Sequence, residues 1–155
     1  MRIINRMLDA ATLLVTLCGV LFLVLFLLGI KPFIVMSGSM EPEIQTGSLV
    51  FVDTRDTENI SEGDIIAFES GGNAVTHRVK RVENGNIITK GDANNNTDGE
   101  IINQSAVIGK TIHSIPYVGF VVNSLRSPVA IILFALICII HLVLTAIEYK
   151  KGETL

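Results

Sequence analysis

Three side chains of the types used in nucleophilic catalysis occur in order in the middle of the chain. Ser39 follows Ser37 and Gly38, and His77 and Asp98 come after it. A serine hydroxyl is a poor nucleophile until a base takes its proton. Histidine, with an ordinary pKa of about 6.5, suits that task, and an aspartate can fix the tautomer of its imidazole. The set predicts a serine hydrolase.

The choice of His77 as base rests on its surroundings in the sequence. His77 lies in the β-prone run Val75–Val79, where alternation can direct its side chain into a cleft, whereas His113 has no acidic neighbour. The third histidine, His141, lies in an apolar run, where an ionisable group is by default a candidate functional residue. It lies near the expected cytoplasmic end, far from Ser39, so we expect no role for it in catalysis.

Two apolar runs predict transmembrane helices. Ala11–Ile30 contains no charge and no proline, and twenty residues at about 1.5 Å each span a bilayer core of about 30 Å. A cleaved signal peptide is the alternative, but its apolar region has only about 7–15 residues, so we predict an uncleaved anchor. Val129–Ile147 is the second run. Ser39 would thus lie just outside the membrane.

Basic residues near the chain ends predict the orientation. Arg2 and Arg6 precede the first run, and Lys150 and Lys151 follow the second. The positive-inside rule therefore puts both ends in the cytoplasm. The predicted order is a cytoplasmic N-terminus, a transmembrane helix, an extracytoplasmic or lumenal catalytic domain, a second transmembrane helix and a cytoplasmic tail, at residues 1–10, 11–30, 31–127, 128–147 and 148–155.

The segment between the apolar runs reads as strands. Asn84-Gly85 is a strong hairpin signal because both residues tolerate positive φ. No stretch here has a sustained helical period. We predict a small, mostly antiparallel β domain between two membrane helices, with strands at Ser48–Val52, Asp64–Phe68, Ala74–Glu83, Ile87–Lys90, Ala106–Ile112 and Tyr117–Val122.

Composition excludes several function classes. Acidic residues outnumber basic ones in the middle segment, so nucleic-acid binding is not expected, because phosphate contacts require a basic face. Both cysteines, Cys18 and Cys138, lie in the apolar runs. The middle segment therefore has no disulfide and no Cys-based metal site, and we expect no metal, no cofactor and resistance to chelators.

Four ordered blocks give the chain a resemblance to a known family. It resembles the type I signal peptidases, in the endoplasmic-reticulum-type branch found in eukaryotes, archaea and some Gram-positive bacteria. The resemblance runs from about Lys31 to Phe120, and a weaker match follows at Gly109-Lys110 and Ile115–Gly119. The four blocks are Ser37-Gly38-Ser39-Met40-Glu41-Pro42, Gly63-Asp64-Ile65-Ile66-Ala67-Phe68, Thr76-His77-Arg78-Val79, and Lys90-Gly91-Asp92-Ala93-Asn94 with Asp98.

The resemblance implies a signal-peptidase-like β fold and a role for each site residue. Ser39 is similar to the nucleophile of these enzymes, and His77 stands where the typical bacterial branch has a lysine base. Asp98 resembles the third catalytic residue, with Asp92 as the alternative or a supporting acid. The Ser39 backbone N–H and the Ser37 hydroxyl are the implied oxyanion donors. Neutral His77 as base predicts that activity falls below about pH 6.

The same resemblance implies a membrane-bound serine endopeptidase that removes N-terminal signal peptides from exported precursors after small residues. Its expected partners are those precursors, the lipid bilayer and possible accessory subunits. Its expected location is the cell membrane, or the endoplasmic reticulum membrane in a eukaryote. Phe33–Val35 either dip into the membrane interface or line the substrate pockets, or they simply continue the apolar span outward. The alternative function is a noncatalytic membrane scaffold subunit of a secretion or peptidase complex, in which Ser39 and His77 would be replaceable.

Overall fold

The computed structural model describes residues 2–153. Met1, Thr154 and Leu155 lie outside the described residues, as do the side chains of Arg2, Lys150 and Lys151, on which the predicted orientation partly rests. The chain divides into two compact units, one of residues 22–121 and one of residues 1–21 with 122–155.

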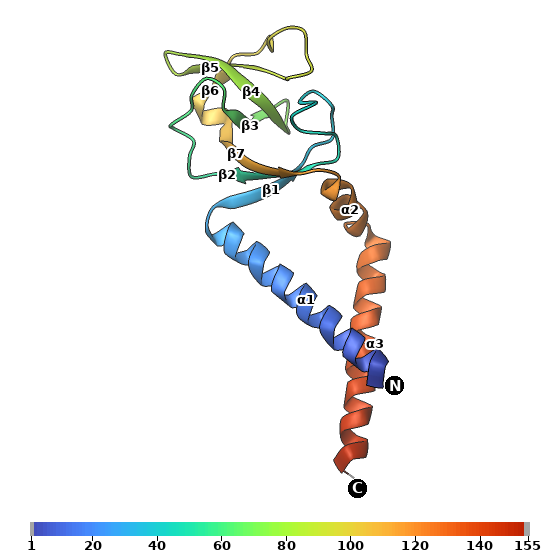
Figure 1. Cartoon of the computed structure of the whole chain (residues 1–155). Coiled ribbons are helices and arrows are strands. Elements are labelled where there is room, and N and C mark those ends of the chain that lie inside the picture. Colours follow the sequence, from blue (N-terminus) through green and yellow to red (C-terminus); the bar gives the residue numbers. More distant parts are fainter. Residues whose placement is uncertain (1, 154–155) are drawn as a thin grey trace. The chain divides into compact units, whose positions relative to one another are not determined.

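The first unit is built around one seven-stranded sheet. Its strand order is β1-β2-β7-β3-β4-β5-β6, and every neighbouring pair is antiparallel (Figure 1). The prediction of a mostly antiparallel β domain is therefore confirmed. The strands are β1 Ile30–Ile34, β2 Leu49–Asp53, β3 Ile65–Ser70, β4 Asn73–Glu83, β5 Asn86–Lys90, β6 Ile102–Asn103 and β7 Val107–Ile115, with a short 3-10 helix, η1, at Gln104–Ala106.

The hairpin between β4 and β5 forms where the sequence predicts it. Glu83 pairs with Asn86, so the loop has two residues, Asn84 and Gly85, with φ of 51° and 78°. Two positive φ values give the turn a twist that matches the flanking strands. This turn fixes which β5 residue lies opposite each β4 residue.

One predicted strand is wrong. Tyr117–Val122 was expected to be extended, but Val118–Leu125 forms the helix α2. Tyr117 has a φ of 63°, which ends the extended backbone of β7. The run Val118–Val122 is apolar without alternation, so its pattern does not separate a short helix from a strand. Gly119 is buried, and a Cβ there would lie 2.7 Å from the Gly47 carbonyl oxygen.

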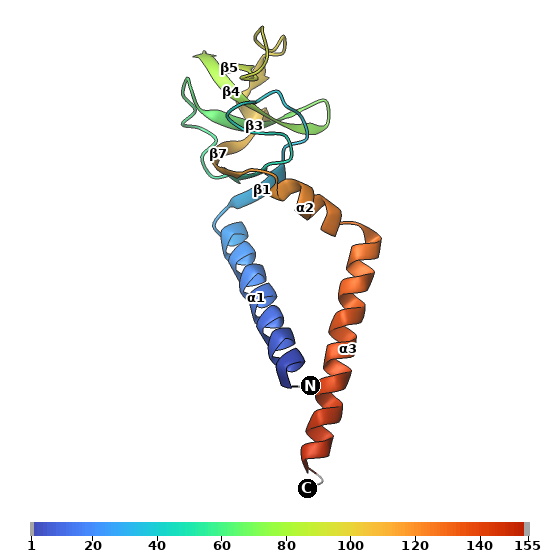
Figure 2. The same cartoon turned by 45° about the vertical axis from the view of Figure 1, so that its right-hand side comes forward.

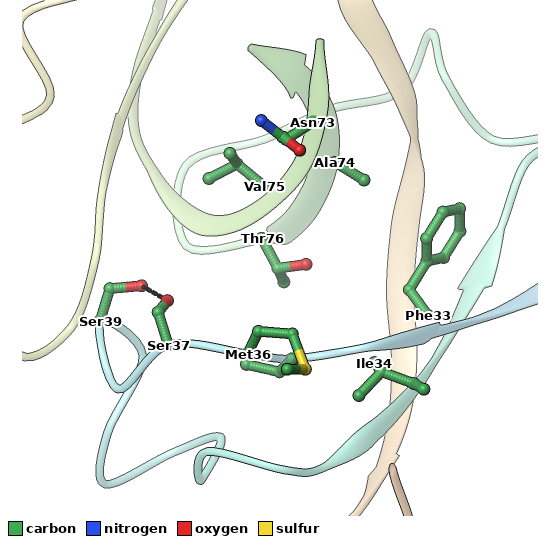
Figure 3. A pocket seen from close by; sticks show the side chains of 10 residues that line it. Phe33, Ile34, Met36, Ser37, Ser39, Asn73, Ala74, Val75 and Thr76 are labelled. Carbon is green, nitrogen blue, oxygen red and sulfur yellow. Dashed lines mark hydrogen bonds between the residues drawn. The ribbon is translucent and has the colours of Figure 1, made fainter. Parts of the chain in front are cut away.

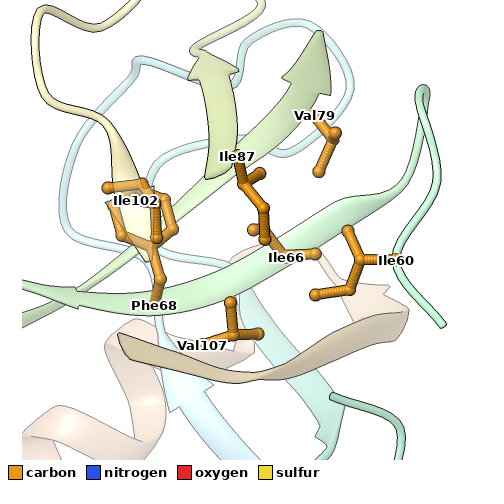
Figure 4. Packing of buried hydrophobic residues seen from close by; sticks show 7 residues of the cluster. All are labelled: Ile60, Ile66, Phe68, Val79, Ile87, Ile102 and Val107. Atoms are coloured by element: carbon orange, nitrogen blue, oxygen red, sulfur yellow. The ribbon is translucent and has the colours of Figure 1, made fainter. Parts of the chain in front are cut away.

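Buried apolar side chains form two clusters in this unit. The first, which Figure 4 shows, lies largely on one face of β3, β4 and β5, and the second contains the fully buried Met40. The first comprises Ile60, Ile66, Phe68, Val79, Ile87, Ile102 and Val107; the second comprises Val35, Met40, Ile44, Val50, Val52 and Ala67. Between them they hold the strands and the loop after β1 in fixed positions.

The second unit contains most of α1 and the whole of α3, the two long helices visible in Figure 2. Helix α1 is Arg2–Leu27, and its segment Arg6–Leu27 (22 residues, mean hydropathy 2.7) is long and apolar enough to cross a membrane. It is the one such helix among the described residues of the chain. Helix α3 is Pro128–Glu153, and its membrane crossing stays a prediction.

His141 contacts the other helix of this unit. Its Nε2 lies 3.8 Å from Asp9 Oδ1 on α1. An imidazole in an apolar helix thus faces a polar group on its neighbour. The expectation that His141 takes no part in catalysis stays a prediction.

Candidate active site

The loop that follows β1 holds Ser39. Met40, the next residue, is fully buried in the second apolar cluster. The Ile44 N–H donates to the Met40 carbonyl at 2.9 Å, and the Glu41 N–H donates to Gly38 O at 3.1 Å. A buried anchor directly after Ser39 leaves its side chain little freedom to move away from the sheet.

His77 faces Ser39 from β4. It pairs with Ile66 on β3, and only 9% of its surface is exposed. Its Nε2 lies 2.9 Å from Ser39 Oγ, which is hydrogen-bond distance. The Phe68 ring meets the imidazole edge-on, with centroids 6.2 Å apart. The base candidate is thus held on a rigid strand, in contact with the nucleophile candidate.

Asp98 lies on the other side of the imidazole. Its Oδ2 is 2.6 Å from His77 Nδ1, and the same oxygen accepts a 2.6 Å hydrogen bond from Thr89 Oγ1. The Asp98 N–H donates to the Thr89 carbonyl at 2.8 Å. Ser39, His77 and Asp98 therefore form one continuous chain of hydrogen bonds. Such a chain can activate a serine hydroxyl for attack on a carbonyl carbon.

Asp92 points to a different partner. Its two carboxylate oxygens accept from Nε and Nη2 of Arg78 at 2.9 Å and 2.7 Å, and Arg78 Nη1 donates to the Gly63 carbonyl at 3.0 Å. The hydrogen bonds from the Arg78 guanidinium lower the pKa of the Asp92 carboxyl, against the opposing effect of its burial. This bidentate ion pair fastens the Asp92 loop to β4 beside His77.

The same loop supports the backbone of the nucleophile candidate. The Ala93 N–H donates to the Ser39 carbonyl oxygen at 2.9 Å. A Cβ at Gly91 would lie 2.5 Å from that oxygen, closer than real Cβ atoms come. Only glycine permits this approach, so Gly91 and the Arg78–Asp92 pair together set the position of Ser39.

Acid should weaken this unit through three carboxyls. Arg78 holds the pKa of Asp92 below its ordinary value of 3.8, and hydrogen bonds from Arg55 lower that of Asp53 to about 2. Burial alone would raise the pKa of Asp64, but hydrogen bonds from Lys110 and the Ser61 N–H lower it. The three ion pairs therefore stabilise the fold above about pH 4, and this contribution is lost as the pH falls toward 2. We expect the Tm of the full chain in detergent, followed by circular dichroism, to drop over this range.

Asp92→Asn should make that drop shallower, because it removes one of the three carboxyls whose pKa is lowered. Glu83→Gln is the matched control, since the Arg81–Glu83 pair is 3.2 Å long and more than half exposed on both sides. Exposed pairs contribute little to stability. A Tm profile for Asp92→Asn that matches the wild type would contradict the assignment.

A cleft of about 340 Å³ opens beside Ser39 (Figure 3). One wall is the segment from the end of β1 to Ser39, and the other is the start of β4. The structure supports the reading in which Phe33–Val35 line a pocket, and not the one in which they continue the apolar span, because Phe33 and Ile34 lie in the strand β1. The cleft is lined by Phe33, Ile34, Val35, Met36, Ser37, Ser39, Asn73, Ala74, Val75 and Thr76.

The two residues that carry the oxyanion candidates, Ser37 and Ser39, both line this cleft. Ser37 Oγ is 3.2 Å from Ser39 Oγ, the contact drawn in Figure 3. The Ser39 N–H donates to no residue that the structure describes. Both donors are therefore close to the position where a carbonyl attacked by Ser39 would develop negative charge.

Other candidate groups lie apart from this arrangement. His113 is exposed on β7, and its imidazole forms no hydrogen bond with a residue that the structure describes. Among the residues that the structure describes, no three His, Cys, Asp or Glu side chains are grouped to hold a metal ion. Thr89, by contrast, contacts Asp98 in this site, although nothing in the sequence marks it as a site residue. In the sequence, Thr89 has the pattern of an ordinary inward-facing strand residue. Its contact with Asp98 arises only in the folded structure.

Comparison with known families places this geometry in context. The family model described as Peptidase S24-like matches residues 32–112, just over half of the chain. The chain belongs to the peptidase S24-like family. The matched residues include Ser39, His77 and Asp98 and extend from β1 into β7.

Curated proteins similar to this S24-like chain are signal peptidases, which confirms the resemblance seen in the sequence. A signal peptidase complex catalytic subunit of Colletotrichum graminicola is 34% identical over 102 residues, covering 57% of this chain and 59% of that protein. Signal peptidase I W of Bacillus subtilis is 40% identical over 79 residues, covering 47% and 42%. A signal peptidase complex catalytic subunit of Canis lupus familiaris is 34% identical over 102 residues, covering 57% and 53%. The match thus spans about three fifths or less of each relative.

Proposed function

We propose that this chain is a membrane-bound serine endopeptidase that removes N-terminal signal peptides from exported precursors. The observation that carries the proposal is the hydrogen-bonded chain from Ser39 Oγ through His77 to Asp98, beside a cleft that can take an extended peptide. Membership of the S24-like family and the names of the similar proteins support the same activity.

In the proposed reaction, Ser39 Oγ attacks the scissile carbonyl carbon while His77 Nε2 takes the hydroxyl proton. The tetrahedral intermediate collapses to an acyl-enzyme as His77 gives that proton to the leaving amine nitrogen. Water, deprotonated by His77, then attacks the ester, and the proton returns to Ser39 when the acyl group leaves. The 2.9 Å distance between Nε2 and Oγ supports this transfer.

Asp98 and the two donors near Ser39 have supporting roles in this proposal. Asp98 keeps the proton of the neutral imidazole on Nδ1, so that Nε2 is free to act as a base, and it stabilises the imidazolium. The Ser39 N–H and the Ser37 hydroxyl donate to the oxyanion. The 3.2 Å contact between the two serine hydroxyls supports the place of Ser37 beside the reacting carbonyl.

The dimensions of the cleft bear on the substrate. Its small volume and walls of Ile34, Val35, Ala74 and Val75 favour short apolar side chains, in agreement with cleavage after small residues of the A-x-A type. The substrates we propose are precursors whose signal peptide crosses the bilayer beside the apolar helix Arg6–Leu27. The catalytic unit would then face away from the cytoplasm.

The proposed partners follow from the names of similar proteins. Two of them are catalytic subunits of a signal peptidase complex, so accessory subunits are proposed here as well. The name of the relative from Bacillus subtilis mentions neither a complex nor a subunit. An enzyme that acts alone is therefore the alternative that the test must separate from a complex.

The test is cleavage of a precursor with an A-x-A site by purified full-length protein in detergent with added lipid. We expect the wild type to cut at that site and Ser39→Ala to cut at least about 10³-fold more slowly, because the nucleophile is gone. Ser61→Ala is the matched control, since Ser61 is exposed and its hydroxyl forms no hydrogen bond with a residue that the structure describes; only its backbone N–H and carbonyl do, both with Asp64. Full cleavage by a homogeneous Ser39→Ala preparation would end the proposal. A folded wild type that cuts only after partner subunits are added would favour the complex.

A further inference from the structure

Thr89 is a buried polar residue on the inward face of β5, where the neighbouring inward side chain, Ile87, is apolar. On β5 the side chains of Ile87 and Thr89 point inward, and both are 0% exposed. A buried hydroxyl is costly unless it is hydrogen-bonded, and valine would fill nearly the same volume at no such cost. The hydroxyl of Thr89 has one partner among the described residues, Asp98 Oδ2, at 2.6 Å.

The register of the sheet explains how Thr89 reaches the site. Thr89 pairs with Val79 on β4, so the two side chains share one face of the sheet. His77 lies two residues before Val79 and uses the same face. Thr89 is therefore a diagonal neighbour of His77, and the Asp98 carboxylate fits against both.

Asp98 depends on Thr89 for its position. The residue lies in the loop after β5, and the Thr89 carbonyl accepts its backbone N–H at 2.8 Å. Apart from His77, no residue that the structure describes donates to the Asp98 carboxylate except Thr89. The backbone and the side chain of Thr89 thus both hold Asp98, the acid that orients His77.

We propose that Thr89 is a positioning residue for catalysis, whose hydroxyl holds the Asp98 carboxylate in the orientation that His77 requires. This inference rests on the proposed function of Ser39, His77 and Asp98. Thr89 touches neither substrate nor the reacting atoms. It acts through Asp98 alone, by fixing the rotamer of the carboxylate and taking up one lone pair of the oxygen that faces Nδ1.

Thr89→Val in the full-length protein should lower kcat about tenfold with KM within about twofold. A hydrogen bond to a charged group is worth about a factor of ten or more, and the cleft does not include Thr89. Thr89→Ser should stay within about threefold of the wild type, since it keeps the hydroxyl.

Two comparisons separate positioning from a purely structural role. Ile87→Val is the matched control, because Ile87 lies on the same strand and face as Thr89. This substitution removes apolar packing but leaves the hydrogen bonds among His77, Asp98 and Thr89 unchanged. In an Asp98→Asn background, Thr89→Val should lower kcat by less than about twofold, because the interaction through which it acts is already gone. An equal loss in Ile87→Val, a full tenfold loss in the Asp98→Asn background, or failure of Thr89→Ser to restore activity would overturn the inference.

A spectroscopic readout makes the inference independent of the cleavage assay. In the wild type we expect a low-field proton NMR resonance from His77 Nδ1–H, which is hydrogen-bonded at 2.6 Å. Thr89→Val should shift or broaden it, whereas Thr89→Ser and Ile87→Val should leave it in place. Absence of cleavage by the wild type would count against the proposed function, and an unchanged resonance in Thr89→Val would count against the role of Thr89.

Discussion

His77→Ala is expected to lower kcat for precursor cleavage by at least about 10³-fold, because Ser39 then has no base within hydrogen-bond distance. The imidazole Nε2 lies 2.9 Å from Ser39 Oγ. KM should change little, since His77 is not among the residues that line the cleft. The measurement is kcat and KM on a precursor with an A-x-A site, with folding checked by circular dichroism.

His113→Ala is the control for this substitution, because His113 is exposed on β7 and outside the cleft. The double variant Ser39→Ala/His77→Ala should be about as slow as either single variant, since residues that act as one unit are not additive. Two separate losses that multiply in the double variant would contradict a shared proton transfer between Ser39 and His77.

Asp98→Asn should lower kcat by about 10³–10⁴-fold while leaving Tm within a few degrees of the wild type. The carboxamide is close in shape to the carboxylate but carries no charge to stabilise the imidazolium, and it can favour the wrong imidazole tautomer. The His77 Nδ1 to Asp98 Oδ2 distance of 2.6 Å makes this contact direct. Single-turnover cleavage and thermal unfolding of the same preparation separate the two effects.

Asp92→Asn should give the opposite pattern. Removing one partner of the bidentate Arg78–Asp92 pair should cost about 1.5–3 kcal/mol of stability, with a smaller loss of kcat than Asp98→Asn. Measured below its Tm, this variant should remain clearly active. If Asp92→Asn proved slower than Asp98→Asn at equal folded fraction, the roles of the two aspartates would have to be exchanged.

Much of the site could be predicted because its chemistry depends on residue type and order. Ser39, His77 and Asp98 stand in blocks that resemble signal peptidases, and Asn84-Gly85 forms the predicted hairpin because both residues accept positive φ. The apolar length of Arg6–Leu27 likewise follows from composition alone. These are local properties, which a sequence carries without its fold.

One element was predicted wrongly and one strand was not predicted. Val118–Leu125 is a helix, not the predicted strand, because the positive φ of Tyr117 and the burial of Gly119 decide the geometry of an apolar run with no clear period. The edge strand β1 was not predicted, because Ile30 ends the apolar run before it and Pro32, which cannot donate to a sheet, argues against a strand.

The sequence by itself determined which chemistry was available: a serine, a histidine and two acids in the order of a signal peptidase, after an apolar helix. The tertiary structure decided which acid meets the histidine. Asp92 is drawn to Arg78 on one face of β4, while Thr89 holds Asp98 against His77 on the other. The reason is strand alternation, since neighbouring residues on β4 point to opposite faces and only the register of β5 tells which loop group each one reaches.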